Sequence, residues 1–148
     1  MSRPRPEYKI NPLDLKKNVA IGVMLPMGGA PIFKSSYTTE EQAISNLKNL
    51  ILTRKGERPF QPEFGTDVYS LLFEQITEDL GDTLESTMRA DIKYWLPYII
   101  IDDILINVES DNNKVSISMK FKITETGANQ NITILVTDQG AVTIVWGI

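Results

Sequence analysis

Residues 115–123 read VSISMKFKI, in which apolar side chains alternate with serine or lysine at every second position. Successive side chains of a strand point to opposite faces of a sheet, so this alternation predicts a strand with one buried and one solvated face. The chain before it changes to a period of two from Tyr98 onward, with Ile104, Ile106 and Val108 alternating with other residues. Between the two lies SDNNK, residues 110–114, which has the composition of a turn.

Two more apolar stretches follow, NITILVT at 131–137 and AVTIVWGI at 141–148, each preceded by a turn sequence. We therefore expect an antiparallel meander of about four strands. The last stretch carries neither a proline nor a lysine, the residues that commonly protect a sheet edge from pairing. It lies either centrally in its own sheet or at an edge that a partner chain pairs with.

Helical patterns precede the strands. Thr38 and Glu41 have the spacing of a capping box, and the helix they begin should run to about Thr53. A short helix is indicated at 67–74, and the longest one should start after Thr77 and end at Pro97. Their inward stripes are Ala43, Ile44, Leu47, Leu50 and Ile51 in the first helix, and Leu80, Leu84, Met88, Ile92 and Trp95 in the longest. The predicted fold class is α+β, with N-terminal helices packed on a C-terminal antiparallel meander.

The N-terminal residues have a different character. Three prolines and a basic, polar composition in residues 1–18 indicate an extended arm, and residues 19–148 form a single domain. Within that domain, 19–29 should be an extended segment tucked against the core. No run of 18 apolar residues occurs and the first residues lack an apolar signal core, so we expect soluble, intracellular synthesis.

Composition excludes much of enzyme chemistry. The 148 residues include no cysteine and no histidine, which removes thiol nucleophiles, thiolate metal sites and a Ser-His-Asp triad. Charge is divided unevenly, because residues 1–60 hold ten bases and five acids while residues 61–148 hold five bases and fourteen acids. This polarity suits docking to complementary partners, or is simply a solvated surface, and it argues against nucleic-acid binding.

Carboxylates remain as candidate catalytic groups. Glu57 and Glu63 lie in one loop and could in principle cleave a glycosidic bond as a pair. The structural alternative is that they pair with neighbouring cations or accept hydrogen bonds from the loop. Asp102 and Asp103 do not have the ligand spacing of a calcium loop, and we expect no metal and no cofactor.

The loop itself carries a resemblance. The stretch is TRKGERPFQPEFGTDVYSLLFE, residues 53–74: the preceding helix ends in LILTRKGER, residues 50–58, and PEFG and then LLFE follow. This stretch resembles the lysozyme-like baseplate wedge family of contractile-tailed phages, which also supplies a component of type VI secretion baseplates. The resemblance extends from about Ile21 to Val108. It implies a small α+β structural protein of the virion tail baseplate, assembled in the host cytoplasm, and not an enzyme.

The resemblance also implies the partners. They would be other baseplate wedge proteins and tail sheath subunits, whose arms add strands to the sheet and so template the first sheath ring. Many family members carry Glu-Pro-Arg after the long helix, where this chain has Leu96-Pro97-Tyr98 and lacks both charges. The residues expected to contact partners are Arg54, Gly56, Glu57, Arg58, Pro62, Glu63, Phe64, Gly65, Pro97, Tyr98, Val142, Ile144 and Trp146.

Two other functions stay open at this point. One is a carboxylate-based peptidoglycan hydrolase, a tail lysozyme, acting through Glu57 and Glu63. The other is a free monomeric adaptor, against which the N-terminal arm and the unprotected last strand argue. Independently of these, we expect Gly56 and Gly65 to adopt backbone conformations that other residues avoid, and Phe60 and Phe64 to anchor the loop onto the helices.

Overall fold

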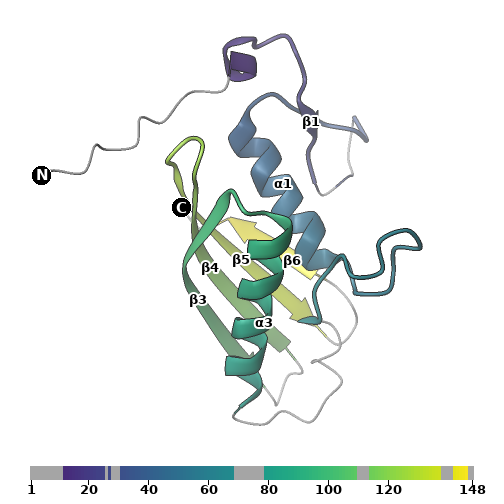
Figure 1. Ribbon diagram of the computed structural model, residues 1–148, viewed down its shortest axis with the longest axis vertical. Helices are drawn as coiled ribbons and strands as arrows, with labels where there is room; N and C mark the ends of the chain where they lie inside the picture. The colour runs from purple at the N-terminus through teal and green to yellow at the C-terminus, as the bar shows by residue number, and fades with distance from the viewer. Residues whose placement is uncertain are drawn as a thin grey trace, which may run out of the picture.

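The structure is a computed structural model that describes residues 12–25, 27, 31–68, 79–109, 114–137 and 142–146, with the backbone alone for 136–137 and 142–146. Its main sheet has four antiparallel strands in sequence order: β3 (Ile99–Glu109), β4 (Lys114–Ile123), β5 (Asn129–Thr137) and β6 (Val142–Trp146). Figure 1 shows the strands side by side in this order. The predicted meander is confirmed.

Buried and more exposed side chains alternate along β4, as the sequence predicts. Its apolar residues Val115, Ile117, Met119, Phe121 and Ile123 are all buried. Opposite them on β5, Ile134 pairs with Ile117 and Ile132 with Met119, and both isoleucines are fully buried. The serines and lysines between these positions lie on the other face of the sheet. One face of the sheet therefore forms the floor of the core.

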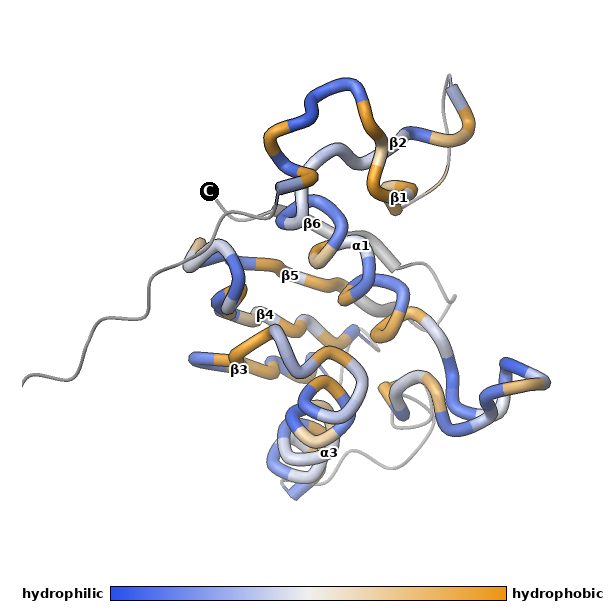
Figure 2. Tube along the Cα trace, turned by 45° about the horizontal axis from the view of Figure 1, so that its top comes forward, coloured by the Kyte–Doolittle hydropathy of each residue, from blue (hydrophilic) through white to orange (hydrophobic). Residues whose placement is uncertain are grey.

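Two helices cover that floor, as Figure 2 shows. They are α1 (Thr39–Leu52) and α3 (Leu80–Trp95), and their buried residues join the strand residues in one apolar cluster. The predicted inward stripes are confirmed, with Ile44 and Trp95 only partly buried at the margin. The fold class is α+β, and the expected cap at Thr77 lies outside the described residues.

Strand β3 begins where the change of period after Tyr98 indicates, but its alternation is interrupted. It starts at Ile99, and its register against β4 shifts between Ile101 and Asp103. A bulge of this kind inserts one residue into a strand and changes the phase of its side chains. For this reason Ile101 and Ile104 both join the core although three positions separate them.

The N-terminal part of the chain departs from the expected extended arm. Pro12–Leu15 form a short 3-10 helix, η1, and Asp14 Oδ1 accepts hydrogen bonds from both the backbone N and Oγ1 of Thr39, each at 2.8 Å. Proline suits the first position of such a turn, and the carboxylate satisfies the first turn of α1. Residues 1–11 of the arm lie outside the described residues.

The segment after η1 is extended, as expected. Its strand β1 (Gly22–Val23) pairs with β2 (Ser35–Ser36) in a small antiparallel sheet beside α1. Lys48 Nζ donates to Leu25 O at 2.9 Å, and this coverage buries Lys48 on a face of α1 that the apolar pattern leaves unassigned. Burial lowers the pKa of Lys48.

The start of α1 follows its capping signal. Thr38 Oγ1 accepts from the backbone N of Glu41 at 3.2 Å, and Glu41 Oε2 accepts from the backbone N of Tyr37 at 2.9 Å. The carboxylate thus reaches one residue further back than in a standard capping box. Among the described helices, none is long and apolar enough to cross a membrane.

Candidate functional site

The loop after α1 is a closed structure that projects from the molecule (Figure 1). Its two ends meet where Thr66 N donates to Thr53 O at 2.9 Å, and Gly56 N donates to Pro62 O at 2.7 Å further out. Gly56 has φ +88° and Gly65 has φ +125°, so both glycines occupy the region that other residues avoid, as expected. The loop is therefore held by its own backbone.

Side chains fix the base of this loop onto α3. The rings of Phe64 and Trp95 meet edge to face with centroids 5.1 Å apart, and the Arg58 guanidinium lies 3.9 Å from the Phe64 centroid. Lys55 Nζ lies 2.9 Å from Asp91 Oδ2 and 3.2 Å from Asp67 Oδ2. Partial burial lowers the pKa of Lys55, but the two carboxylates raise it by more than burial lowers it. The pKa of Lys55 is therefore above its ordinary value.

The expected role of Phe60 is wrong. Phe64 anchors the loop as predicted, whereas the Phe60 side chain is 99% exposed. The reason is geometric, because residues 58–61 form a turn closed by Gln61 N donating to Arg58 O at 3.3 Å. This turn places Phe60 at the tip, away from both helices.

The two loop glutamates line different cavities. Glu57 lines a cavity of about 470 Å³ together with Leu25, Met27 and α1, and its Oε2 accepts from Arg54 N at 3.1 Å. Glu63 lines a different cavity, of about 460 Å³, with Asp91 and Trp95. Both side chains are exposed, and Glu57 satisfies a loop N–H, as the structural alternative holds. Cooperative glycoside cleavage needs two carboxyl groups across one site.

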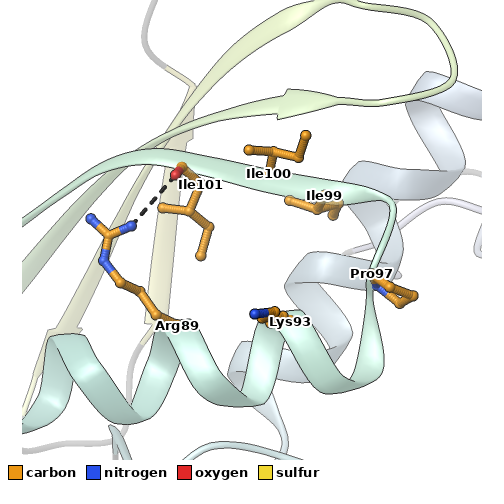
Figure 3. Close-up of a pocket in the computed structure, with 6 residues that line it drawn as sticks. All are labelled: Arg89, Lys93, Pro97, Ile99, Ile100 and Ile101. Atoms are coloured by element: carbon orange, nitrogen blue, oxygen red, sulfur yellow. Dashed lines mark hydrogen bonds between the residues drawn. The ribbon is translucent and has the colours of Figure 1, made fainter.

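A second surface lies at the corner between α3 and β3. There a cavity of about 340 Å³ is lined by Pro97, by Ile99–Ile101, and by Arg89 and Lys93 from the last turns of α3 (Figure 3). Arg89 Nε pairs with Glu85 Oε1 at 2.8 Å, and its Nη1 donates to Ile101 O at 3.4 Å. The corner thus combines apolar walls with two cations that the sequence analysis did not single out.

Pro97 and Tyr98 face different sides of this corner. Tyr98 is half-buried and accepts a hydrogen bond at its hydroxyl from Asn46 Nδ2 at 2.9 Å, while its carbonyl accepts from Thr124 N and Oγ1. Burial raises the pKa of Tyr98, against the lowering effect of the Asn46 hydrogen bond. Tyr98 therefore links β3 to α1, and Pro97 alone of the two lines the cavity beside Lys93.

The third surface is the free side of β6. Its backbone pairs with β5 from Ile132↔Trp146 to Val136↔Val142, and Ile144 stands opposite Ile134. Among the described strands β6 has this one neighbour, so it ends the sheet, and the alternative of a central position is excluded for that part of the chain. Val142, Ile144 and Trp146 all belong to this edge strand.

The structure thus divides the expected contact residues among three places. Arg54, Gly56, Glu57, Arg58, Pro62, Glu63, Phe64 and Gly65 belong to the loop, Pro97 and Tyr98 to the corner, and the last three to β6. Arg89 and Lys93 were missed, although their spacing of four, repeated to Pro97, places the two cations on one helical face. No group of three potential metal-ligating side chains occurs among the described residues.

Known proteins resemble this chain in sequence. Residues 38–128, more than half of the chain, match the family described as baseplate wedge protein gp25. The baseplate wedge protein gp25 of Enterobacteria phage T4 is 41% identical over 64 residues, which are 43% of this chain and 47% of that protein. The matched segment thus spans about half the length of this relative.

Solved structures share the fold. One is a Geobacter sulfurreducens protein proposed to be a tail lysozyme, with TM-score 0.57 and 17% identity over 74% of this chain and 91% of its own. Another is a chain of the anti-feeding prophage baseplate, with TM-score 0.56 and 19% identity over 68% of this chain and 78% of its own. The sequence match covers both helices, the PEFG loop and the first strands of the sheet, and it shows that this chain belongs to the baseplate wedge protein gp25 family.

Proposed function

We propose that this baseplate protein templates the first ring of a contractile tail sheath, by accepting strands from sheath subunits at the β6 edge of its sheet. The observation that carries the proposal is the chemistry of this edge. β6 ends the described sheet, and no charged side chain follows Asp138. An apolar strand at an open edge offers unpaired backbone groups to another chain.

The opposite edge of the sheet supports the choice of β6. Strand β3 is interrupted by its bulge and carries Asp102 and Asp103 beside it. Arg89 also reaches the carbonyl of Ile101 from α3. Bulges and charged residues are the devices by which proteins discourage pairing at an edge. Of the two edges, β3 is protected and β6 is not.

The experiment places lysines on the unprotected edge. Thr143→Lys with Val145→Lys changes β6 positions that pair with Leu135 and Thr133, which alternate along β5 with the buried Ile132 and Ile134. The matched control is Leu105→Lys with Asn107→Lys on β3, two exposed positions of the other edge strand. We expect both proteins to enter baseplates and only the control to support sheath assembly by electron microscopy. Full-length sheaths on baseplates carrying the β6 variant would refute strand addition at β6.

The same proposal covers the neighbours and location of the protein. Within the baseplate of the virion tail, the loop and the α3–β3 corner would contact other wedge proteins, leaving β6 for sheath subunits. Assembly would take place in the host cytoplasm. The separation of the three surfaces supports this division, because the loop and the corner lie on different sides of the end of α3, and neither includes β6.

We further propose that the protein does not cleave peptidoglycan. Glu57 and Glu63 line separate cavities, and Glu57 already accepts a backbone hydrogen bond. We expect the purified protein to release no more soluble fragments from peptidoglycan than a buffer control. Turnover that is lost in Glu57→Gln or Glu63→Gln would instead establish a carboxylate hydrolase.

A further inference from the structure

The cavity at the α3–β3 corner lies at the β3 edge of the described sheet and has apolar walls. Ile101 points from β3 toward α3 and Ile100 points away from it, and both residues line the cavity (Figure 3). Pro97 lines its end, where the chain turns from α3 into β3. The side chain of Ile100 is 51% exposed. The corner therefore offers apolar surface that the described residues leave partly uncovered.

Two cations line the same cavity, one helical turn apart on α3. Arg89 is held in place, because its Nε pairs with Glu85 Oε1 at 2.8 Å and its Nη1 donates to the carbonyl of Ile101 at 3.4 Å. Lys93 is exposed, and no carboxylate of the described residues lies within 4.0 Å of its Nζ. The helix dipole favours a cation in the last turn of α3, which accounts for the charge of Lys93 but not for the apolar walls beside it.

The acidic residues near the corner do not neutralise Lys93. Glu85 is paired with Arg89, and Asp103 stands opposite Lys120 of β4. The described residues that line the cavity include no acid, and residues 96–98 carry no charge. The corner thus combines a net positive charge with apolar walls. Its chemical complement is a carboxylate beside an apolar side chain.

We propose that the corner binds an acidic segment of another wedge protein, in which an apolar side chain enters the cavity and a neighbouring glutamate or aspartate pairs with Lys93. The inference rests on the proposed contact between the corner and other wedge proteins, and it names the chemistry of the partner. Because Arg89 is fixed before binding, the partner carboxylate meets a cation that is already ordered. The net charge of −4 disfavours a nucleic acid as the source of the anion.

The experiment measures binding of the full-length protein to baseplate wedges. Fluorescently labelled protein is titrated with wedges purified from cells infected by a phage mutant that lacks this chain. We expect Lys93→Glu to weaken binding by about tenfold or more, because it places a like charge beside the partner carboxylate. The matched control is Lys17→Glu, which changes the net charge equally at an exposed position outside the corner. It should change affinity by less than about threefold.

A second pair of variants tests the apolar half of the contact. Ile100→Ala truncates a side chain that lines the cavity, whereas Leu105→Ala truncates one on the same strand that is 56% exposed and does not line it. We expect binding to weaken by about fivefold for Ile100→Ala and by less than about twofold for Leu105→Ala. All four variants should melt near the temperature of the parent protein, because each changed side chain is exposed.

Salt dependence gives a measurement that a purely apolar contact would not change. Binding of the parent protein should weaken as ionic strength rises, and Lys93→Gln should reduce this dependence. Equal affinities of Lys93→Glu and Lys17→Glu would overturn the proposal. So would a dimer of the free protein that dissociates on Lys93→Glu, because the acidic segment would then belong to a second copy.

Failure of this inference is distinguishable from failure of the proposed function. If the parent protein and Lys93→Glu bind the wedges equally well, the wedge contact stands and the acidic segment is refuted. If the parent protein does not bind the wedges at all, the wedge contact fails and the inference fails with it. The β6 lysine variant should bind the wedges with the affinity of the parent protein, so sheath templating is tested independently.

Discussion

At the scale of single residues, the loop depends on Gly65. A Cβ built on this residue would press against the carbonyl oxygen of Thr53 and lie 2.9 Å from the carbonyl carbon of Arg54, where the ends of the loop meet. Its φ of +125° is also closed to other residues. Both the lack of space for a Cβ and the positive φ therefore require glycine at position 65.

We expect Gly65→Val to lower the free energy of unfolding by about 1–3 kcal/mol, the scale of a strained backbone residue. The matched control is Gly81→Ala in α3, where an added Cβ meets nothing within 4 Å. That substitution should be neutral or stabilise by up to about 1 kcal/mol, because alanine favours helix. Chemical denaturation of the three proteins measures the difference, and a Gly65→Val protein as stable as the parent would contradict a rigid loop.

Single residues also mark the limit of sequence reasoning. The glycines of the sequence correctly predict a constrained loop, and Phe64 anchors the loop on a helix as expected, through Trp95. Phe60 has the same side chain four residues earlier, yet it is exposed because a turn reverses the chain beneath it. Sequence records the apolar character of both residues, but only the path of the backbone decides which one reaches the core.

At the scale of secondary-structure elements, local pattern predicts most where one face is buried. Strand β4 follows its alternation completely. Strand β3 does not, since the bulge between Ile101 and Asp103 changes the phase of its side chains. In α1 the predicted stripe is correct, but Lys48 is buried as well, because β1 and β2 cover a second face. A bulge, or a segment that covers a second face of a helix, depends on tertiary structure and cannot be predicted from the spacing of apolar residues.

The loop and α3 are joined by an ion pair whose strength can be measured. Lys55 and Asp91 are half-buried, with side chains 31% and 16% exposed, so solvent screens part of their attraction. A double-mutant cycle with Lys55→Met and Asp91→Asn should give a coupling of about 1 kcal/mol in the free energy of unfolding at pH 7. A coupling near zero would mean that the aromatic contacts alone hold the loop.

The coupling should also depend on pH in a defined direction. The folded-state pKa of Lys55 is raised, so its contribution is fully present below the unfolded-state value of about 10.4. It should decline as the pH rises through the higher folded-state pKa. Repeating the cycle across this range provides the check, and a coupling that grows above pH 10.4 would contradict the assignment.

At the scale of the whole molecule, the fold places the three groups of expected contact residues on separate surfaces. The loop and the corner flank the end of α3, whereas β6 ends the sheet beyond β5. The sequence resemblance predicts the family, and the match over residues 38–128 confirms it. The arrangement of the surfaces could not be predicted, since Arg89, Lys93 and Phe60 acquire their positions only through tertiary packing.

The most direct measurement of the central claim is an electron cryo-microscopy map of the junction between baseplate and sheath, determined with the full-length protein. We expect an extended segment of a sheath subunit hydrogen-bonded to the free edge of β6, continuing the order β3-β4-β5-β6 by a further strand. Sheath subunits that join the baseplate elsewhere, with the β6 edge exposed to solvent or occupied by a wedge protein, would contradict it.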